Sequence, residues 1–150
     1  MKLEKVIFMS RVEASTIHPR STEAMISVSI PGDPAPLNQL WHRGNLLRLQ
    51  FHDADQDGNI AMMSHQRTTY IGAVLFSPND ARLVIEFVEG IKNSYTTLYV
   101  HCDAGISRSS AIAKFVAGLY HLHFPDSYQL YNKYVYRVLT NTYNKLMYGE

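Results

Sequence analysis

The chain has 150 residues, of which 46% are hydrophobic and 18% are charged, and its formal net charge is +1. This length suits one domain with a sizeable core, so we expect a single domain over residues 1–150. The near-neutral charge gives no electrostatic reason for nucleic acid or an acidic membrane as the main partner. No apolar run approaches the ~20 residues of a membrane span, and the first residues lack a signal-peptide cleavage site, so we expect a cytoplasmic protein.

Taken in chain order, the first half of the sequence predicts three strands. Val6–Met9 is a short apolar run followed by a polar segment, Ala24–Ile30 is rich in strand-forming residues, and Leu46–Phe51 leads into an acidic loop. Pro31–Pro36 breaks regular structure between the second and third strands. Tyr70–Phe76 fits a strand or a helix, so the sequence leaves this segment undecided.

The next part of the sequence predicts a helix and a fourth strand. Ser77 is a suitable N-cap, and Pro78 occupies the first helical position. Apolar residues then recur at helical spacing until Gly90 or Asn93 ends the helix. The β-rich run Tyr95–His101 predicts the strand that follows.

Two further helices are predicted after this strand. Ser109–His123 has helical spacing and stops before Pro125, and Asp126 or Ser127 caps a last helix that extends toward Leu146. Alternating strands and helices predict an α/β sandwich with a central, mostly parallel sheet flanked by helices. The β-rich start of the chain would add an edge strand of either direction.

The segment Tyr99–Ser110 carries the residues best suited to chemistry. A β-rich apolar run ends at Cys102, five residues including Gly105 lead to Arg108, and a helical pattern then begins. Such a short loop can point its N–H groups inward, and the first turn of the helix adds further donors, so the loop attracts an oxyanion. A thiol at this place ionises readily. Arg108 supplies a planar fork that suits two phosphate oxygens.

The stretch HCDAGISRSS resembles the H-C-x5-R-S signature of the cysteine-dependent protein tyrosine and dual-specificity phosphatases, particularly the small bacterial and phage enzymes. The resemblance implies that Cys102 is the nucleophile and that Arg108 binds phosphate. It also implies that Ser109 stabilises the thiolate and that His101 is a structural residue that orients the loop. The loop amides that would bind phosphate belong to Asp103, Ala104, Gly105, Ile106, Ser107 and Arg108.

A phosphatase of this kind also needs a general acid on a separate loop. The family takes it from an aspartate after an earlier strand, and Asp53 fits that pattern because it follows Leu46–Phe51 closely. Asp55 and Asp57 are close alternatives, since the separation from Cys102 is longer than small enzymes of this family usually have. The sequence does not decide among the three aspartates.

The reaction implied by the resemblance is hydrolysis of phosphotyrosine, with phosphoserine and phosphothreonine as further substrates, through a cysteinyl-phosphate intermediate. A phosphoprotein or phosphopeptide would be the partner, and phosphate, sulfate or vanadate would bind in the loop. No metal or other cofactor is expected, since amides and Arg108 supply the positive charge. Cys102 is the only cysteine, which excludes an intrachain disulfide and a multi-cysteine metal site.

Other functions remain open from the sequence. The intact loop would also serve a catalytically weak module that holds a phosphoprotein, and sulfur or arsenate chemistry uses C-x5-R loops as well. Asp53–Ile60 matches the first eight positions of a calcium-binding EF-hand loop, although position twelve is Ser64 instead of a glutamate. The same acidic stretch would also suit a loop that closes over phosphate.

Overall fold

A computed structural model describes residues 1–61, 67–69 and 72–149 of the chain. The centre is a four-stranded sheet in the order β1-β6-β2-β3, in which every neighbouring pair is parallel. These strands are β1 (Lys5–Met9), β2 (Glu23–Ser29), β3 (Leu46–Gln50) and β6 (Thr97–His101). The predicted α/β architecture with a central parallel sheet is confirmed, and the chain's first strand is an edge strand of the same direction.

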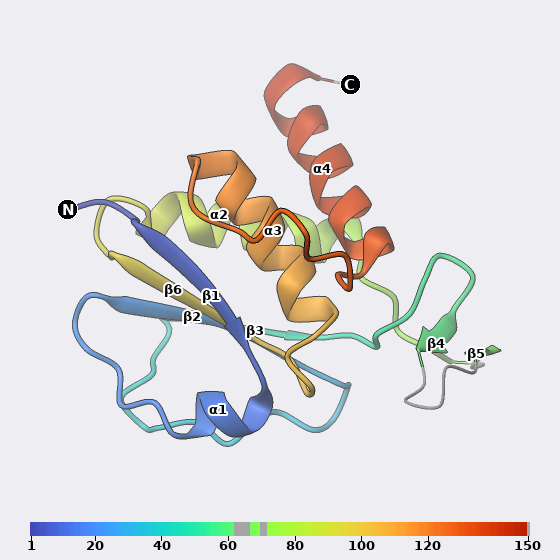
Figure 1. Cartoon of the computed structure of the whole chain (residues 1–150), viewed down its shortest axis with the longest axis horizontal. Helices are drawn as coiled ribbons and strands as arrows, with labels where there is room; N and C mark the ends of the chain where they lie inside the picture. The colour runs from blue at the N-terminus through green and yellow to red at the C-terminus, as the bar shows by residue number, and fades with distance from the viewer. Residues whose placement is uncertain (62–66, 70–71, 150) are drawn as a thin grey trace.

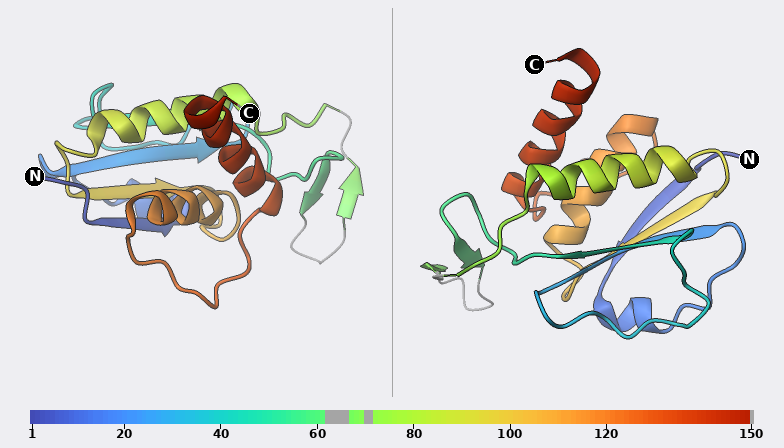
Figure 2. Two further views of the ribbon diagram at one scale, coloured as in Figure 1. Left: turned by 90° about the horizontal axis from the view of Figure 1, so that it is seen from above. Right: turned by 180° about the vertical axis from the view of Figure 1, so that it is seen from behind.

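Helices cover both faces of the sheet (Figure 1). The helices α2 (Pro78–Ile91), α3 (Arg108–Tyr120) and α4 (Lys133–Tyr148) lie on one face, and the short α1 (Arg11–Ser15) lies on the other (Figure 2). Because both faces are covered, β2 is buried from Ala24 onward, which explains its nearly continuous apolar sequence.

Two apolar clusters hold these layers together. The larger cluster joins the sheet to α2, α3 and α4, and its fully buried members include Ile26, Leu98 and Ile112. The smaller cluster lies on the face of α1 and contains Met25 and Trp41. Met25 and Ile26 are neighbours in β2 and enter different clusters because successive strand residues point to opposite faces. No helix in the described part of the chain is long and apolar enough to cross a membrane.

The structure corrects the predicted boundaries of the last two helices. The helix α3 ends at Tyr120, where His121 adopts a left-handed conformation with φ 57°, several residues before Pro125. The helix α4 begins at Lys133 with Asn132 as N-cap, so Asp126 and Ser127 do not start it. Aromatic rings of the connection and of α4 instead surround a lysine of α3. Lys114 Nζ lies 5.4 Å and 5.1 Å from the ring centres of Phe124 and Tyr131 in the connection, and 5.6 Å from that of Tyr136 in α4.

Two regions contain elements that the sequence did not predict. The polar segment after β1 forms α1, which Ser10 and Glu13 cap reciprocally. The acidic segment after β3 forms an antiparallel pair of short strands, β4 (Asn59–Ala61) and β5 (Arg67–Thr69). The undecided segment Tyr70–Phe76 has neither helix nor strand over residues 72–76, and its first two residues lie outside the described part of the chain.

Candidate active site

The predicted phosphate loop lies between β6 and α3, at the carboxyl end of an inner strand of the sheet (Figure 1). Cys102 follows β6 directly, and its side chain is only 2% exposed. Its Sγ lies 3.1 Å from the hydroxyl oxygen of Ser109, which is fully buried in the first turn of α3. The sequence-predicted nucleophile and its predicted hydroxyl partner are therefore in direct contact.

Gly105 allows the loop to pack against the end of β1. Its φ is +75°, a conformation that L side chains rarely adopt. A Cβ at this position would collide with the backbone N of Ser10 and would lie 2.5 Å from the carbonyl carbon of Met9. Glycine is thus required here both by the backbone conformation and by the close approach of the preceding strand.

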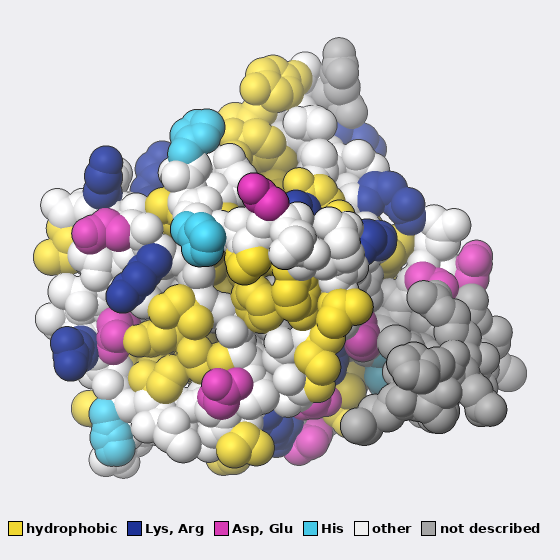
Figure 3. Space-filling model, in the orientation of Figure 1, with side chains coloured by type: hydrophobic (Ala, Val, Ile, Leu, Met, Phe, Trp, Pro, Cys, Tyr) yellow, Lys and Arg dark blue, Asp and Glu magenta, His cyan; other side chains and the backbone are white. Residues whose placement is uncertain are grey.

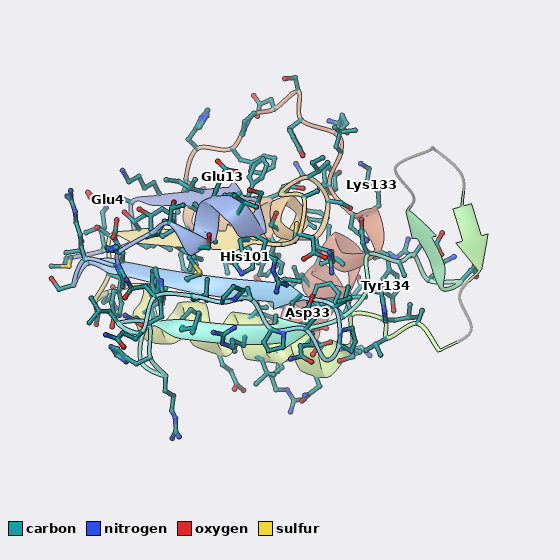
Figure 4. All side chains as sticks on the ribbon, turned by 90° about the horizontal axis from the view of Figure 1, so that it is seen from below. Glu4, Glu13, Asp33, His101, Lys133 and Tyr134 are labelled. Atoms are coloured by element: carbon teal, nitrogen blue, oxygen red, sulfur yellow. The ribbon has the colours of Figure 1, made fainter. Side chains whose placement is uncertain are left out.

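His101 supports the loop from inside the sheet, as expected for a structural histidine. Its side chain is fully buried, and its Nδ1 lies 3.1 Å from the carbonyl oxygen of Cys102. Burial lowers the pKa of His101, which favours the neutral ring. A neutral ring that donates from Nδ1 must accept at Nε2, so the Ser27 hydroxyl, 2.6 Å away, donates to it. Figure 4 shows His101 within the body of the molecule.

Arg108 is held by one group of the loop and by one group that follows β3. Its side chain is buried, and the guanidinium donates to the carbonyl oxygen of Phe51 at 2.8 Å and to the carboxylate of Asp103 at 3.2 Å. Asp103 also lies 3.7 Å from the guanidinium of Arg11. A guanidinium has five N–H donors, and the hydrogen bonds to Phe51 and Asp103 use two of them. The sequence predicted the backbone contribution of Asp103 but not its carboxylate contact with Arg108.

The start of α3 is left without a side-chain cap. Ser107 is the N-cap residue, but its hydroxyl makes no capping hydrogen bond and donates instead to Oδ1 of Asp53 at 2.8 Å. The carbonyl of Ile106 accepts from the hydroxyls of Ser110 and Tyr128, both at 2.5 Å. Burial raises the pKa of Tyr128, which keeps this donor protonated. Within the described residues no side chain caps the first turn of α3, so its N–H groups can bind an anion.

The structure places the carboxylate of Asp53 against the loop. Asp53 follows β3, which ends at Gln50, and accepts hydrogen bonds from Ser107 and Asn132, both at 2.8 Å. The carboxylate of Asp55 accepts from the backbone N–H of Asp57 at 2.9 Å within the acidic segment, and Asp57 is exposed. Asp53 is therefore in direct contact with the phosphate loop through Ser107.

Two hydrogen bonds between His52 and Val74 join the beginning of the acidic segment to its end. The backbone N–H of His52 donates to the carbonyl of Val74 at 2.8 Å, and the N–H of Val74 donates to Nδ1 of His52 at 2.9 Å. This pairing anchors the chain directly before Asp53. The position of that aspartate is thus set by β3 together with the pairing of His52 and Val74.

The calcium-binding interpretation of Asp53–Ile60 finds little in the described residues to favour it. A strand precedes this segment, whereas a helix precedes an EF-hand loop. One oxygen of Asp53 already accepts two hydrogen bonds from the chain. Over residues 1–61, 67–69 and 72–149, no group of three or more histidines, cysteines, aspartates or glutamates is arranged to hold a metal ion. Ser64, the twelfth position of the motif, lies outside the described residues.

Several residues of the site were not found from the sequence. Asn132 and Tyr128 contact the loop from the connection before α4, 30 and 26 residues after Cys102, where no motif marks them. The S-x-x-E spacing at Ser10 would have indicated α1. On the face shown in Figure 3, basic and acidic side chains are interspersed, in keeping with the net charge of +1.

No protein-family model matches this chain, and no curated protein matches it.

Proposed function

We propose that this chain is a metal-independent, cysteine-dependent phosphatase that hydrolyses phosphotyrosine, and also phosphoserine and phosphothreonine, in cytoplasmic phosphoproteins or phosphopeptides. The observation that carries the proposal is the meeting of three groups at the start of α3. They are the Cys102 thiol, the Arg108 guanidinium and an uncapped helix N-terminus. Together they suit a nucleophile that attacks a tightly held phosphate.

In the first step, the Cys102 thiolate attacks phosphorus while the bond to the leaving oxygen breaks. The loop amides of Asp103–Arg108 and the guanidinium bind the equatorial oxygens, and this arrangement stabilises the transition state most strongly. Asp53 gives its proton to the leaving oxygen, which would otherwise depart as an unfavourable alkoxide or phenolate. The products are the free alcohol and a cysteinyl-phosphate.

In the second step, water attacks the phosphorus of the cysteinyl-phosphate and the S–P bond breaks. The Asp53 carboxylate, now ionised, accepts a proton from that water. The Ser109 hydroxyl donates to the sulfur as it regains negative charge, a role supported by their 3.1 Å separation. Inorganic phosphate leaves, and the thiolate is restored.

A second candidate function is a phosphoprotein-binding module with weak catalysis. It is favoured by Asp103, whose carboxylate lies 3.2 Å from the Arg108 guanidinium and offsets part of its charge. Both functions use the same loop to hold phosphate. They differ in whether phosphate is released.

The test is an assay of the purified chain on phosphotyrosine and phosphoserine peptides with chelator present, beside the Cys102→Ser variant. We expect phosphate release by the parent chain and none by the variant, which keeps binding inorganic phosphate in calorimetry because the loop and Arg108 are unchanged. Equal turnover by the two proteins would contradict the proposal. Phosphopeptide binding without turnover by the parent chain would establish the binding module instead.

A further inference from the structure

Four of the hydrogen bonds of Asn132 join three separate segments of the chain. Its backbone N–H donates to the carbonyl of Ser107 at 3.0 Å, and its Oδ1 accepts from the N–H of Val135 at 3.0 Å, which caps α4. Its Nδ2 donates to Oδ1 of Asp53 at 2.8 Å and to the carbonyl of Ala54 at 3.2 Å. The side chain thus ties the start of α4 to the acidic segment, and the backbone N–H of the same residue ties it to the phosphate loop.

The orientation of this amide is set by the groups around it. If the amide were rotated by 180°, its oxygen would face the carboxylate of Asp53 and its NH2 group would face the N–H of Val135. Both contacts would then be repulsive, so the donor must point to Asp53. The start of α4 lies on the side of the molecule that carries the hairpin of β4 and β5, as the labelled Lys133 and Tyr134 show (Figure 4).

The hydrogen bonds at Asp53 distinguish its two carboxylate oxygens. Oδ1 accepts from both Ser107 and Asn132, whereas within the described residues no hydrogen bond reaches Oδ2. Two donors on Oδ1 leave no favourable place there for a proton. When Asp53 is protonated, the proton therefore resides on Oδ2, the oxygen that is available to a leaving group.

We infer that Asn132 is a positioning residue for the general acid, acting through Asp53. This inference rests on the proposed phosphatase function. Asn132 directs the proton of Asp53 to Oδ2 and fixes the distance between the acid and the phosphate loop, because its backbone is bonded to Ser107. An acid held by the loop that binds phosphate keeps its geometry relative to the substrate, and misplacement of about 1 Å costs up to about 10²-fold in rate.

Asn132→Ser is the primary test, because serine is also a good N-cap but has no amide to reach Asp53. We expect hydrolysis of phenyl phosphate to slow by about 10-fold to 10²-fold, while hydrolysis of an activated aryl phosphate changes little. Combined with Asp53→Ala, the variant should cause no further loss that depends on the leaving group. Equal slowing of both substrates, or a full additional loss in the double variant, would overturn the inference.

Asn132→Asp provides a second test with the cap retained. The introduced carboxylate would face that of Asp53 across a hydrogen-bonding distance, so the pair would share a proton. We expect the alkaline limb of the phenyl phosphate rate profile to move to higher pH, a change that a purely structural role would not produce. An unmoved alkaline limb would contradict the inference.

The outcomes separate this inference from the proposed function. If the parent chain releases no phosphate, or if Cys102→Ser remains active, the proposed function fails. If Asp53→Ala shows leaving-group dependence and Asn132→Ser does not, only the role of Asn132 is wrong. Ser77→Ala, which removes a helix cap away from the site, is the matched control for a general loss of stability.

Discussion

The helices α2 and α3 both begin with a serine N-cap, yet the two serines do different things. At α2, the Ser77 hydroxyl accepts from the N–H of Asp80 at 3.0 Å, and the Asp80 carboxylate accepts from the N–H of Ser77 at 2.9 Å. At α3, Ser107 has helical backbone angles of φ −110° and ψ −62°, and its hydroxyl donates to Asp53. The start of α2 is closed by its own side chains, and the start of α3 is not.

This difference shows that a serine N-cap stabilises the helix at α2, whereas at α3 it contributes to a candidate site. The first N–H groups of any helix lack partners within the helix. A capping box satisfies them locally and stabilises the helix. At α3 the side-chain cap is absent, and a nucleophile and an arginine lie beside the first turn. The first N–H groups of this helix can therefore bind an anion.

Among the variants that keep Cys102, the largest effect is expected from Asp53→Ala, which removes the group that accepts a hydrogen bond from the Ser107 hydroxyl. Hydrolysis of phenyl phosphate should slow by about 10²–10⁴-fold, the usual contribution of proton donation. An activated aryl phosphate should be almost unaffected, and the alkaline limb of the pH profile should vanish. Steady-state kinetics on both substrates over a range of pH measures this.

Asp55→Ala and Asp57→Ala are the controls for that experiment. The carboxylate of Asp55 accepts from the N–H of Asp57 within the acidic segment, so we expect any loss in either variant to be small and equal for the two substrates. Leaving-group dependence in Asp55→Ala and not in Asp53→Ala would transfer the role to Asp55.

Arg108→Lys tests whether the start of α3 needs a planar guanidinium that binds two phosphate oxygens, or only a positive charge. An ammonium group keeps the charge but cannot bind two oxygens in one plane, and it cannot reach Phe51 and Asp103 together. The rate should fall by about 10²–10³-fold, as on loss of a donor that stabilises the transition state. A rate within a few-fold of the parent would show that charge alone suffices.

The loop before α3 also depends on a buried histidine, for which the start of α2 has no counterpart. The pKa of His101 is lowered from its ordinary value of 6.5 by burial. The unfolded chain therefore binds a proton that the folded chain does not, so the contribution is fully present above about pH 6.5 and is lost as pH falls. The slope is at most about 1.4 kcal/mol per pH unit.

Urea denaturation at several pH values measures this linkage, with His101→Gln as the comparison. The variant should be less stable at neutral pH, and its free energy of unfolding should decline less between pH 6.5 and 5. Parallel curves for the two proteins would mean that His101 contributes nothing to the acid sensitivity.

The smallest effect is expected from Ser77→Ala at the closed start of α2. Loss of an N-cap costs about 1 kcal/mol, because the N–H of Asp80 loses its acceptor. Thermal unfolding should show the loss, and phosphatase activity at 25 °C should be unchanged. A fall in activity as large as that of Arg108→Lys would mean that the two helix starts are not functionally distinct.

Local patterns in the sequence determined much of this protein. Short apolar runs predicted the four strands of the sheet, and Ser77 with Pro78 predicted the start of α2, because strand periodicity and helix caps depend on neighbouring residues. The spacing from Cys102 to Arg108 predicted the loop for the same reason. The antiparallel pair of β4 and β5 was missed, since its strands have only three residues each and little apolar character.

The tertiary structure alone decided which distant groups meet. Nothing local marks Asn132 as a partner of Asp53, 79 residues away, or Phe51 as an acceptor for Arg108, 57 residues away. The sequence left Asp53, Asp55 and Asp57 as alternatives, because all three follow the same strand. The packing of β3, the phosphate loop and α4 against one another brings the Asp53 carboxylate to the loop. Contacts between separate elements depend on how the faces of those elements pack, and not on spacing along the chain.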